Sequence, residues 1–247
     1  MFPICHIYFA DRVFGSISDF SVLGSIYPDA VISKVLNRDV THYNTKKIYQ
    51  YFKNDDEYMK EFALGAESHG VDMKGIDYYS DEKYLDSDRG YCFLKGKRIE
   101  KEVIDCCHVP ENLGLWKAHN FIEMAFELYL DNKNSYTKEL FKNALSQKSK
   151  ISYISRKLSS FYGIEASYFE KKFCNFSYFF DYEHVNAYTM AQKYSLQLYQ
   201  KHGIKNMDVK LGASAILKGV DIIKEDAESF LDYVVRRFKA DIDLQNA

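Results

Sequence analysis

The strongest helical signal in the chain is the segment LGLWKAHNFIEMAFELYLD at residues 113–131. Apolar residues recur in it at helical spacing, and this spacing returns through most of the chain, whereas no segment keeps the alternation typical of a strand. Proline, which interrupts helices, occurs only three times in 247 residues. The pattern predicts an all-α protein, a single multi-helix bundle-like domain of about eight to ten helices.

Turn-forming residues indicate where several of these helices begin and end. A first helix is expected to end near Gly15, and a short second helix to begin with Ser18 or Asp19 as its N-cap. Pro28 is expected to break the second helix, because the residue before a proline is pushed out of the helical region. Gly163 is a natural left-handed residue after a later helix.

Residues 77–111 differ from the rest because they are polar, irregular and rich in turn formers. We expect mostly loop there, with a short helix or strand around residues 97–106, and a loop this long is often functional. No repeat, low-complexity segment or Gly/Ser linker divides the chain. Residues 1–247 are therefore expected to form one domain, with at most a weak division near residues 140–150.

Composition argues against several classes of protein. The net charge is −2, so the chain carries no nucleic-acid signal of the kind that a basic field gives. No apolar run approaches the roughly 20 residues that span a bilayer, so no transmembrane segment is expected. The start, MFPICHIYFADRVF, lacks the basic region of a signal peptide. The five cysteines are odd in number and lack CxxC spacing, which predicts a reduced, cytoplasmic protein.

His119 and Glu123 lie one helical turn apart on the same face of the predicted helix at 113–131. Apolar neighbours such as Phe121 and Ile122 indicate at least partial burial, and buried polar groups need a partner. A hydrogen-bonded pair and a pair of metal ligands are about equally compatible with this spacing.

Histidines and carboxylates are mixed together in the first half of the chain. Imidazole and carboxylate groups together suit Zn²⁺ and related ions, and a helix bundle can bring such ligands together in its centre. Each residue taken singly has an ordinary explanation as a core, capping or turn residue, so a metal site among the helices of the first half is inferred from the set. The candidates are His6, Asp29, His42, His69, Asp72, His119 and Glu123, with Asp77, His108 and His184 as weaker ones.

The sequence CCH at residues 106–108 is a rival metal cluster. Adjacent cysteines rarely point at one ion, so this cluster ranks below the set of histidines and carboxylates. His184 heads a predicted helix, where it could line a substrate cleft, although a capping or surface role is more common for such a histidine.

The first half contains, in this order, the segments HIYFADRVFGSI, GSIYPDAV, THYN, FALGAESHGVD and KAHNFIEMAFE. Together they resemble the zinc-dependent phospholipase C family, which is related to the single-strand-specific zinc nucleases. The resemblance covers about residues 5–127, and the second half is similar only in being helical. It implies an all-helical fold and up to three zinc ions held by His, Asp and Glu side chains.

The resemblance also implies which residues bind metal: His6, Asp29, His42, His69, His119 and Glu123. The mid-chain motif of the family is H-x-x-x-D, but here Met73 stands at the fourth position after His69, so Asp72 or Asp77 is expected to substitute. His108 is a weak match to a further histidine of the family. In secreted members of the family the N-terminal amine is a ligand of the third metal site. The start of this chain lacks the basic region of a signal peptide, so we expect two ions more readily than three. The ions are expected to be zinc or another divalent metal.

The activity that the resemblance implies is metal-dependent hydrolysis of phosphoesters, as a phosphodiesterase or phosphatase. Metal-activated water would attack, and Asp29 would be a ligand that also accepts a proton. The expected partner is a phosphate-containing small molecule or a lipid head group, and the sequence gives no oligomeric state. One alternative is a helical ligand- or partner-binding protein with a degraded site, which Met73 favours somewhat. Another is an HD-type phosphohydrolase, although the chain has no His-Asp dipeptide.

Overall fold

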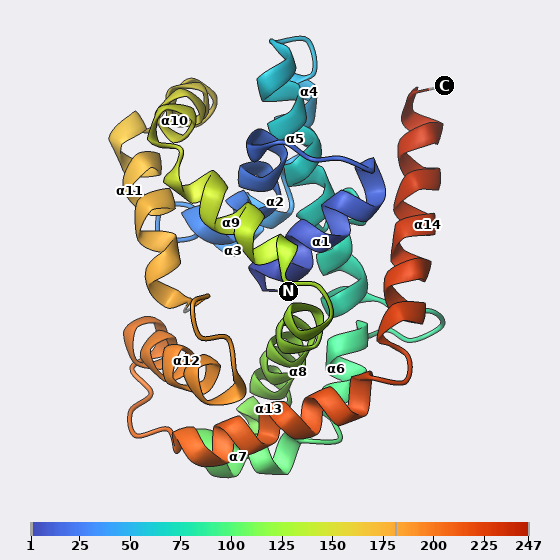
Figure 1. Ribbon diagram of the computed structural model, residues 1–247, viewed down its shortest axis with the longest axis vertical. Helices are drawn as coiled ribbons and strands as arrows, with labels where there is room; N and C mark the ends of the chain where they lie inside the picture. Colours follow the sequence, from blue (N-terminus) through green and yellow to red (C-terminus); the bar gives the residue numbers. More distant parts are fainter. Residues whose placement is uncertain (1, 181, 247) are drawn as a thin grey trace. The chain divides into compact units, whose positions relative to one another are not determined.

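The computed structural model describes residues 2–180 and 182–246, and over these residues it is all-α, as predicted (Figure 1). The described residues form fourteen α-helices, one π-helix and one 3-10 helix, and no β-strand. The helices outnumber the prediction because several of them are too short to show a repeating apolar pattern. None of the described helices is both long and apolar enough to cross a lipid bilayer.

Contacts divide the chain into two units, each built from separate stretches of sequence. The N-terminal unit contains Pro3–Tyr78, Tyr136–Ser177 and the chain from Asp232 onward. The central unit contains Phe2, Tyr79–Ser135 and Tyr178–Leu231. The chain passes from one unit to the other after Tyr78, Ser135, Ser177 and Leu231 rather than near residues 140–150. That residues 1–247 form a single domain stays a prediction.

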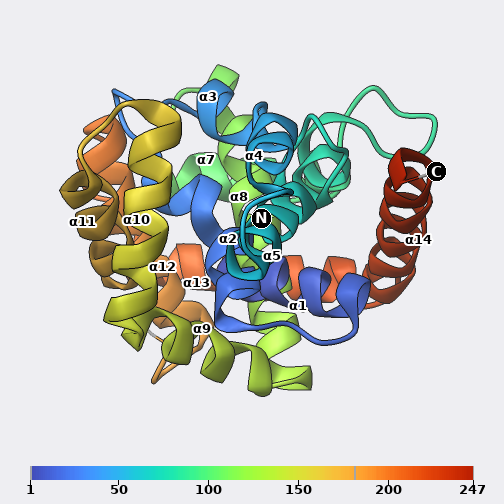
Figure 2. The same cartoon turned by 90° about the horizontal axis from the view of Figure 1, so that it is seen from above.

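In the N-terminal unit, α2 packs along α5, and each of the other helices lying wholly within the unit contacts one of these two. The two helices lie side by side in both views (Figure 1 and Figure 2). The helices of this unit are α1 (Pro3–Phe14), α2 (Asp19–Val31), α3 (Arg38–His42), α4 (Thr45–Phe52), α5 (Glu57–His69), α9 (Tyr136–Ser146), α10 (Lys148–Tyr162) and α11 (Ala166–Phe176).

In the central unit, the long helix α8 has the same role, because it contacts four other helices of the unit. The helices that lie wholly in this unit, or all but their first residue, are η1 (Tyr78–Glu82), α6 (Tyr91–Gly96), α7 (Glu100–Cys107), α8 (Glu111–Lys133), η2 (Ser177–Phe179), α12 (Ala187–His202) and α13 (Val209–Ile223). The last helix, α14 (Ala227–Asn246), crosses the division between the units.

Most helix ends predicted from local signals are confirmed. Helix α1 ends at Phe14, and Gly15 follows it with a left-handed φ of 78°. The N-cap of α2 is Ser18, whose side chain accepts hydrogen bonds from the backbone of Phe20 and Ser21. Gly163 caps α10 with φ of 67°, a conformation that glycine adopts without strain.

The prediction that Pro28 breaks the second helix is wrong, since α2 continues through it to Val31. A proline at this position removes one intrahelical hydrogen bond, the one to the carbonyl of Gly24. Because Pro28 is buried and close to the end of α2, the packing of this helix against its neighbours outweighs that local loss. Asp29 is therefore presented from a helix rather than from a turn.

The prediction of a mostly irregular segment at 77–111 is also wrong. The segment holds η1, α6 and α7, and α7 accounts for the short element expected around residues 97–106. Each of these helices is short, and tertiary burial stabilises them: both α6 and α7 pack against α8. The buried residues include Tyr91 and Cys92 in α6 and Val103 and Cys106 in α7.

Two glycines allow α2 and α5 to touch backbone to backbone. A Cβ atom on Gly24 would lie 2.0 Å from the carbonyl oxygen of Phe62, and one on Gly65 would lie 2.3 Å from that of Ser21. No side chain fits at either position, so the two helices approach more closely than larger residues would permit. This contact brings the end of α5 against the middle of α2, where the candidate site begins.

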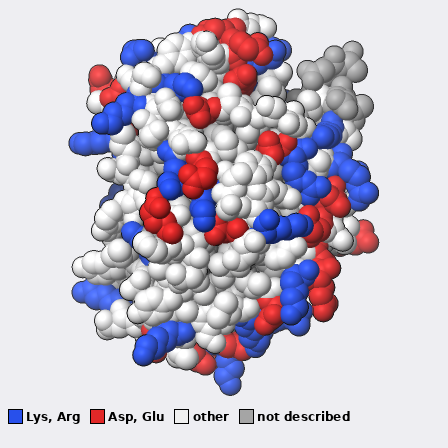
Figure 3. All heavy atoms as spheres, in the orientation of Figure 1, with Lys and Arg blue, Asp and Glu red and all other residues white. Residues whose placement is uncertain are grey.

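The surface carries both signs of charge. On the face drawn in Figure 3, basic and acidic side chains occur next to each other, in agreement with the net charge of −2. That face therefore offers no single-sign field that would attract a polyanion.

Candidate metal centre

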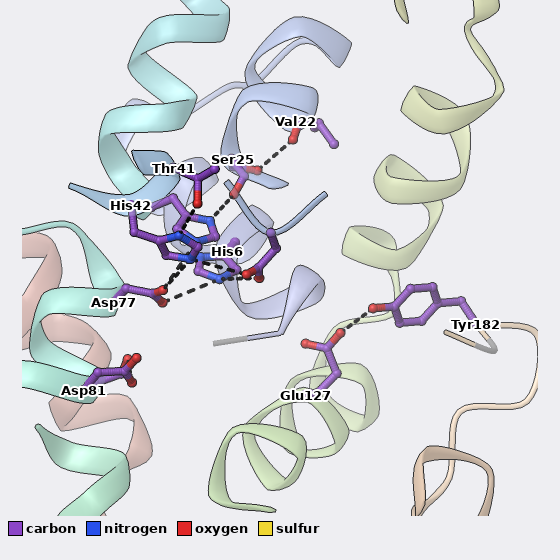
Figure 4. A network of polar contacts seen from close by, with 12 residues as sticks. His6, Val22, Ser25, Thr41, His42, Asp77, Asp81, Glu127 and Tyr182 are labelled. Atoms are coloured by element: carbon purple, nitrogen blue, oxygen red, sulfur yellow. Dashed lines mark hydrogen bonds and ion pairs between the residues drawn. The ribbon is translucent and has the colours of Figure 1, made fainter. Parts of the chain in front are cut away.

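Five of the predicted side chains converge in the N-terminal unit, and we call them the histidine–aspartate cluster. They come from four helices and from the helical residues that lead directly into η1, so the cluster joins distant parts of the sequence. Figure 4 shows His6, His42 and Asp77 pointing toward one another, with Ser25 and Thr41 on the other side of the imidazoles from Asp77. The members are His6 in α1, Asp29 in α2, His42 in α3, His69 in α5, and Asp77.

The Nε2 atoms of the three histidines face the oxygens of the two carboxylates. His42 Nε2 lies 3.3 Å from Asp29 Oδ1 and 3.5 Å from Asp77 Oδ2. His6 Nε2 lies 3.7 Å from Asp29 Oδ2 and 3.6 Å from Asp77 Oδ1. His69 Nε2 lies 3.3 Å from Asp77 Oδ2. All of these distances exceed that of a strong charge-assisted hydrogen bond, so the groups surround a common point rather than pairing tightly.

The imidazole rings pack on one another around this point. The rings of His6 and His69 are stacked with centroids 3.6 Å apart and planes 7° from parallel. The ring of His42 meets that of His69 edge to face, with centroids 4.9 Å apart. The three histidine side chains are at most 2% exposed, whereas the Asp29 side chain is 30% exposed and is the member that reaches solvent.

The other ring nitrogens of two histidines have partners that fix their orientation. His69 Nδ1 lies 2.7 Å from the carbonyl oxygen of Ser25, and His42 Nδ1 lies 2.7 Å from Thr41 Oγ1. A carbonyl oxygen only accepts, so His69 Nδ1 carries the proton and donates it. In neutral His69 the Nε2 atom is then a bare lone pair aimed at the Asp77 carboxylate. Histidines that bind metals usually have this arrangement.

Burial and mutual interactions shift the ionisation of the cluster. Burial, reinforced by His69, holds the pKa of His6 well below its usual value, and burial likewise lowers the pKa of His42. Burial alone would raise the pKa of Asp29, but its hydrogen bond with His42 and the neighbouring histidines outweigh burial and lower it. The pKa of the Asp77 carboxyl is also lowered although burial alone would raise it, and the interactions with His69 and His6 contribute to this lowering. Neutral imidazoles beside carboxylates are the forms that bind metal ions.

Asp72 lies outside the cluster, so its place in the predicted ligand set needs correction. Its carboxylate accepts hydrogen bonds from Thr45 Oγ1 at 2.5 Å and from the Lys46 backbone at 3.0 Å, at the start of α4. Helix α5 ends at His69, so residues 69 and 72 do not share a helical face. The turn that follows brings Asp77, 4% exposed, to the histidines instead.

A second group of potential ligands lies in the central unit, and we call it the Asp81 group. It consists of Asp81 in η1 and of His119 and Glu123 in α8, with one ligand atom of each within 4.8 Å of the others. Both α8 residues are buried, at 5% and 6% exposure. The helical spacing predicted from the sequence therefore places the two side chains on a common face.

Neighbouring side chains hold the Asp81 group in place. The His119 ring stacks on Phe93 with centroids 4.3 Å apart, and its Nε2 atom lies 2.6 Å from the Nδ2 atom of Asn120. Ser80 Oγ donates to Asp81 Oδ1 at 2.7 Å. Gly96 lets α6 approach α8 closely beside His119, because a Cβ atom on Gly96 would lie 3.1 Å from the backbone nitrogen of His119.

Sequence reasoning missed Asp81. It stands in the segment expected to be irregular, and η1, a five-residue π-helix, carries no periodic signal. The one available signal was its spacing of four from Asp77, which predicts a shared face only when the intervening residues are helical.

The weaker candidates lie on the surface. His108 is exposed and caps α7 with a left-handed φ of 52°, and His184 is exposed in the loop before α12, where its carbonyl oxygen accepts from Thr189. Neither belongs to a group of potential ligands among the described residues. The sulfurs of Cys106 and Cys107 are close to each other, but the exposed His108 does not complete a metal cluster with them.

Among the described residues the arrangement provides three groups of mostly buried nitrogen and oxygen ligands that could each hold a metal ion; two of these groups share His69 within the histidine–aspartate cluster, and the third is the Asp81 group. Comparison with protein-family models, with curated proteins and with solved structures gives no match to this chain.

Proposed function

We propose that the protein is a metal-dependent hydrolase of phosphoesters, similar in type to the phospholipase C family. The observation that carries the proposal is the approach of His69 Nε2 to Asp77 Oδ2 at 3.3 Å, while His69 Nδ1 donates to the Ser25 carbonyl. Two acceptors facing each other in a buried site repel, and a cation between them turns the repulsion into attraction.

A metal ion explains this geometry better than a network of imidazolium–carboxylate pairs. Such a network would place three positive rings against one another, with two of them stacked face to face at 3.6 Å. Burial opposes protonation of His6 and His42. One divalent ion supplies the positive charge at the centre of the cluster while the rings stay neutral, and His/Asp ligation suits zinc.

We propose two ions per chain, zinc or another divalent metal, with one held by the histidine–aspartate cluster and one by the Asp81 group. A bound ion of this kind polarises phosphoryl oxygens and lowers the pKa of bound water toward about 7. The side chain of Asp29 is the partly exposed member of its cluster, so it can pass a proton between the site and solvent. We assign it the role of ligand and proton acceptor.

The remaining members of the cluster act as fixed ligands. His69 and His42 are held by Ser25 and Thr41, so their rings cannot rotate without losing a hydrogen bond. We infer a substrate with a phosphoester group, either a small molecule or a lipid head group, and a cytoplasmic location.

The test is reconstitution of the purified protein with zinc and assay with bis(4-nitrophenyl) phosphate. We expect hydrolysis that chelation abolishes, and a loss of about 100-fold or more in Asp29→Asn. His184→Ala is the matched control, because this histidine is exposed and lies outside both groups. A folded protein that binds no zinc and has unchanged stability in chelator would instead favour a helical binding protein with a degraded site.

A further inference from the structure

Two adjacent cysteines at the end of α7 lie with their sulfurs together. Cys106 Sγ and Cys107 Sγ are 3.7 Å apart, and both residues are fully buried. Neighbouring side chains in a helix normally diverge, so this contact is a property of the helix end rather than of helical geometry. The proposed hydrolase function uses neither residue.

The surroundings make the two sulfurs unequal. Cys106 Sγ donates a hydrogen bond to the carbonyl oxygen of Val103 at 3.5 Å, which favours the thiol form of this sulfur. The hydrogen bond to Cys107 and burial both raise the pKa of the Cys106 thiol. Cys107 is thus placed as the attacking sulfur and Cys106 as the thiol that resolves the product.

We propose that Cys106 and Cys107 are a redox-active dithiol that closes to a disulfide when it meets a peroxide. In the first step the Cys107 thiolate attacks one peroxide oxygen, forming a sulfenic acid and releasing hydroxide. In the second step the Cys106 sulfur attacks the sulfenic sulfur, the S–S bond forms, and a water molecule leaves. The two thiols lose two electrons and two protons, and hydrogen peroxide is reduced to two molecules of water.

The position of the pair at the helix end makes closure feasible. Cys107 is the last residue of α7, and His108 after it already adopts φ of 52°. The last turn of a helix has the fewest backbone hydrogen bonds to break, so peroxide needs only a local opening of this turn to reach the buried sulfurs. The Cys106 carbonyl oxygen accepts from the Asp208 backbone at 2.8 Å, so closure also changes a link to the N-terminus of α13.

The disulfide of two consecutive residues is strained, because their Cα atoms are closer than ordinary disulfide geometry prefers. Strained disulfides are reduced easily, as expected of a reversible rather than a structural bond. We therefore expect mild dithiothreitol to restore the dithiol completely.

The experiment uses the full chain carrying Cys174→Ser, which removes the exposed cysteine that would link two molecules. The native protein is treated with a small excess of hydrogen peroxide, unfolded, alkylated with iodoacetamide and digested with trypsin. Cleavage after Lys101 and Lys117 yields one peptide, residues 102–117, that contains both cysteines and no others. Cys5 and Cys92 are equally buried and serve as internal controls in separate peptides.

The expected result is a 102–117 peptide that lacks both alkyl groups and is about 2 Da lighter than its reduced form, reversibly. The control peptides stay fully alkylated, which shows that proximity rather than exposure decides the reaction. The proposal is overturned if the 102–117 peptide is fully alkylated after peroxide, or if it carries added oxygen atoms instead of the internal bond. Neither outcome depends on metal content or on hydrolytic activity.

Discussion

His69 Nε2 and the Asp77 carboxylate face each other at 3.3 Å in the interior of the N-terminal unit. Neutral His69 cannot donate a hydrogen bond to this carboxylate, because its proton is on Nδ1, which donates to the Ser25 carbonyl oxygen. The two residues are eight apart in sequence: His69 ends α5, and Asp77 lies beyond the following turn, in the helical residues that lead into η1. Their approach makes Asp77 rather than Asp72 the carboxylate of the site, and the two aspartates provide a direct test.

Asp77→Asn should lose the zinc ion of the histidine–aspartate cluster, whereas Asp72→Asn should keep it. The amide of asparagine removes the negative charge at the centre of the cluster, which weakens binding of a divalent ion by about 10-fold or more. Asp72 accepts hydrogen bonds at the start of α4, so its replacement should cost about 1 kcal/mol of stability and no metal. Metal analysis after gel filtration and thermal unfolding measure the two effects, and equal zinc loss in both variants would contradict the assignment.

The ion of the Asp81 group should be lost independently of the other. In Asp81→Asn we expect the zinc content to fall from about two to about one per chain. Asp86→Asn is the matched control, because Asp86 is exposed in the loop that follows η1 and belongs to no ligand group among the described residues. Unchanged zinc content in Asp81→Asn would remove this residue from the site.

Chelation should lower the thermal stability of the wild-type protein. Any ion that binds the folded state and not the unfolded state adds to stability, by about 2.7 kcal/mol at a concentration one hundred times Kd. We expect the melting temperature to fall in EDTA and to recover with added zinc. In the Asp77→Asn variant the same treatment should have a smaller effect, since one of the two ions is already absent.

Glu67 should make stability depend on pH in the metal-free protein. This α5 residue is 2% exposed, its Oε1 atom has no hydrogen-bond partner among the described residues, and burial together with Asp72 raises its pKa to about 8. The folded state therefore holds a proton that the unfolded chain releases near its ordinary pKa. The stability that this proton contributes is fully present below pH 4.5 and is lost as the pH rises toward 8.

Glu67→Gln cannot ionise, so it should lack this loss. We expect the melting temperature of Glu67→Gln minus that of the wild-type protein, both in EDTA, to increase between pH 5 and pH 8, by an amount equivalent to a few kcal/mol at most. A difference that stays constant over this range would show that the carboxyl ionises at its ordinary pKa.

Gly65→Ala should destabilise the protein even though alanine is the better helix former. Helix propensity alone would give a gain of about 1 kcal/mol. The added Cβ atom, however, would lie 2.3 Å from the backbone oxygen of Ser21, and a backbone group cannot move aside as a side chain can. Overpacking of this kind costs about 1–3 kcal/mol or more. Chemical denaturation measures the balance, and a gain in stability would mean that α2 and α5 separate without cost.

Local sequence signals predicted much of the secondary structure. Ser18 as N-cap, Gly15 and Gly163 at helix ends, and the long helix around His119 all follow from chemistry within a few residues. The same signals failed at Pro28, because a proline near the end of a well-packed helix loses one hydrogen bond while the burial of that helix is unaffected.

The amino-acid sequence by itself determined that the protein is helical, where several helices begin or end, and that His119 and Glu123 share a face, because each of these depends on neighbours along the chain. Only the tertiary structure decided that Asp77 and not Asp72 meets the histidines, and that Asp81 lies beside His119. The reason is that these partners come from different elements, which meet through packing such as the glycine contact between α2 and α5 and the approach of α6 to α8. Packing of that kind depends on the shapes of many distant side chains at once, and no spacing along the sequence records it.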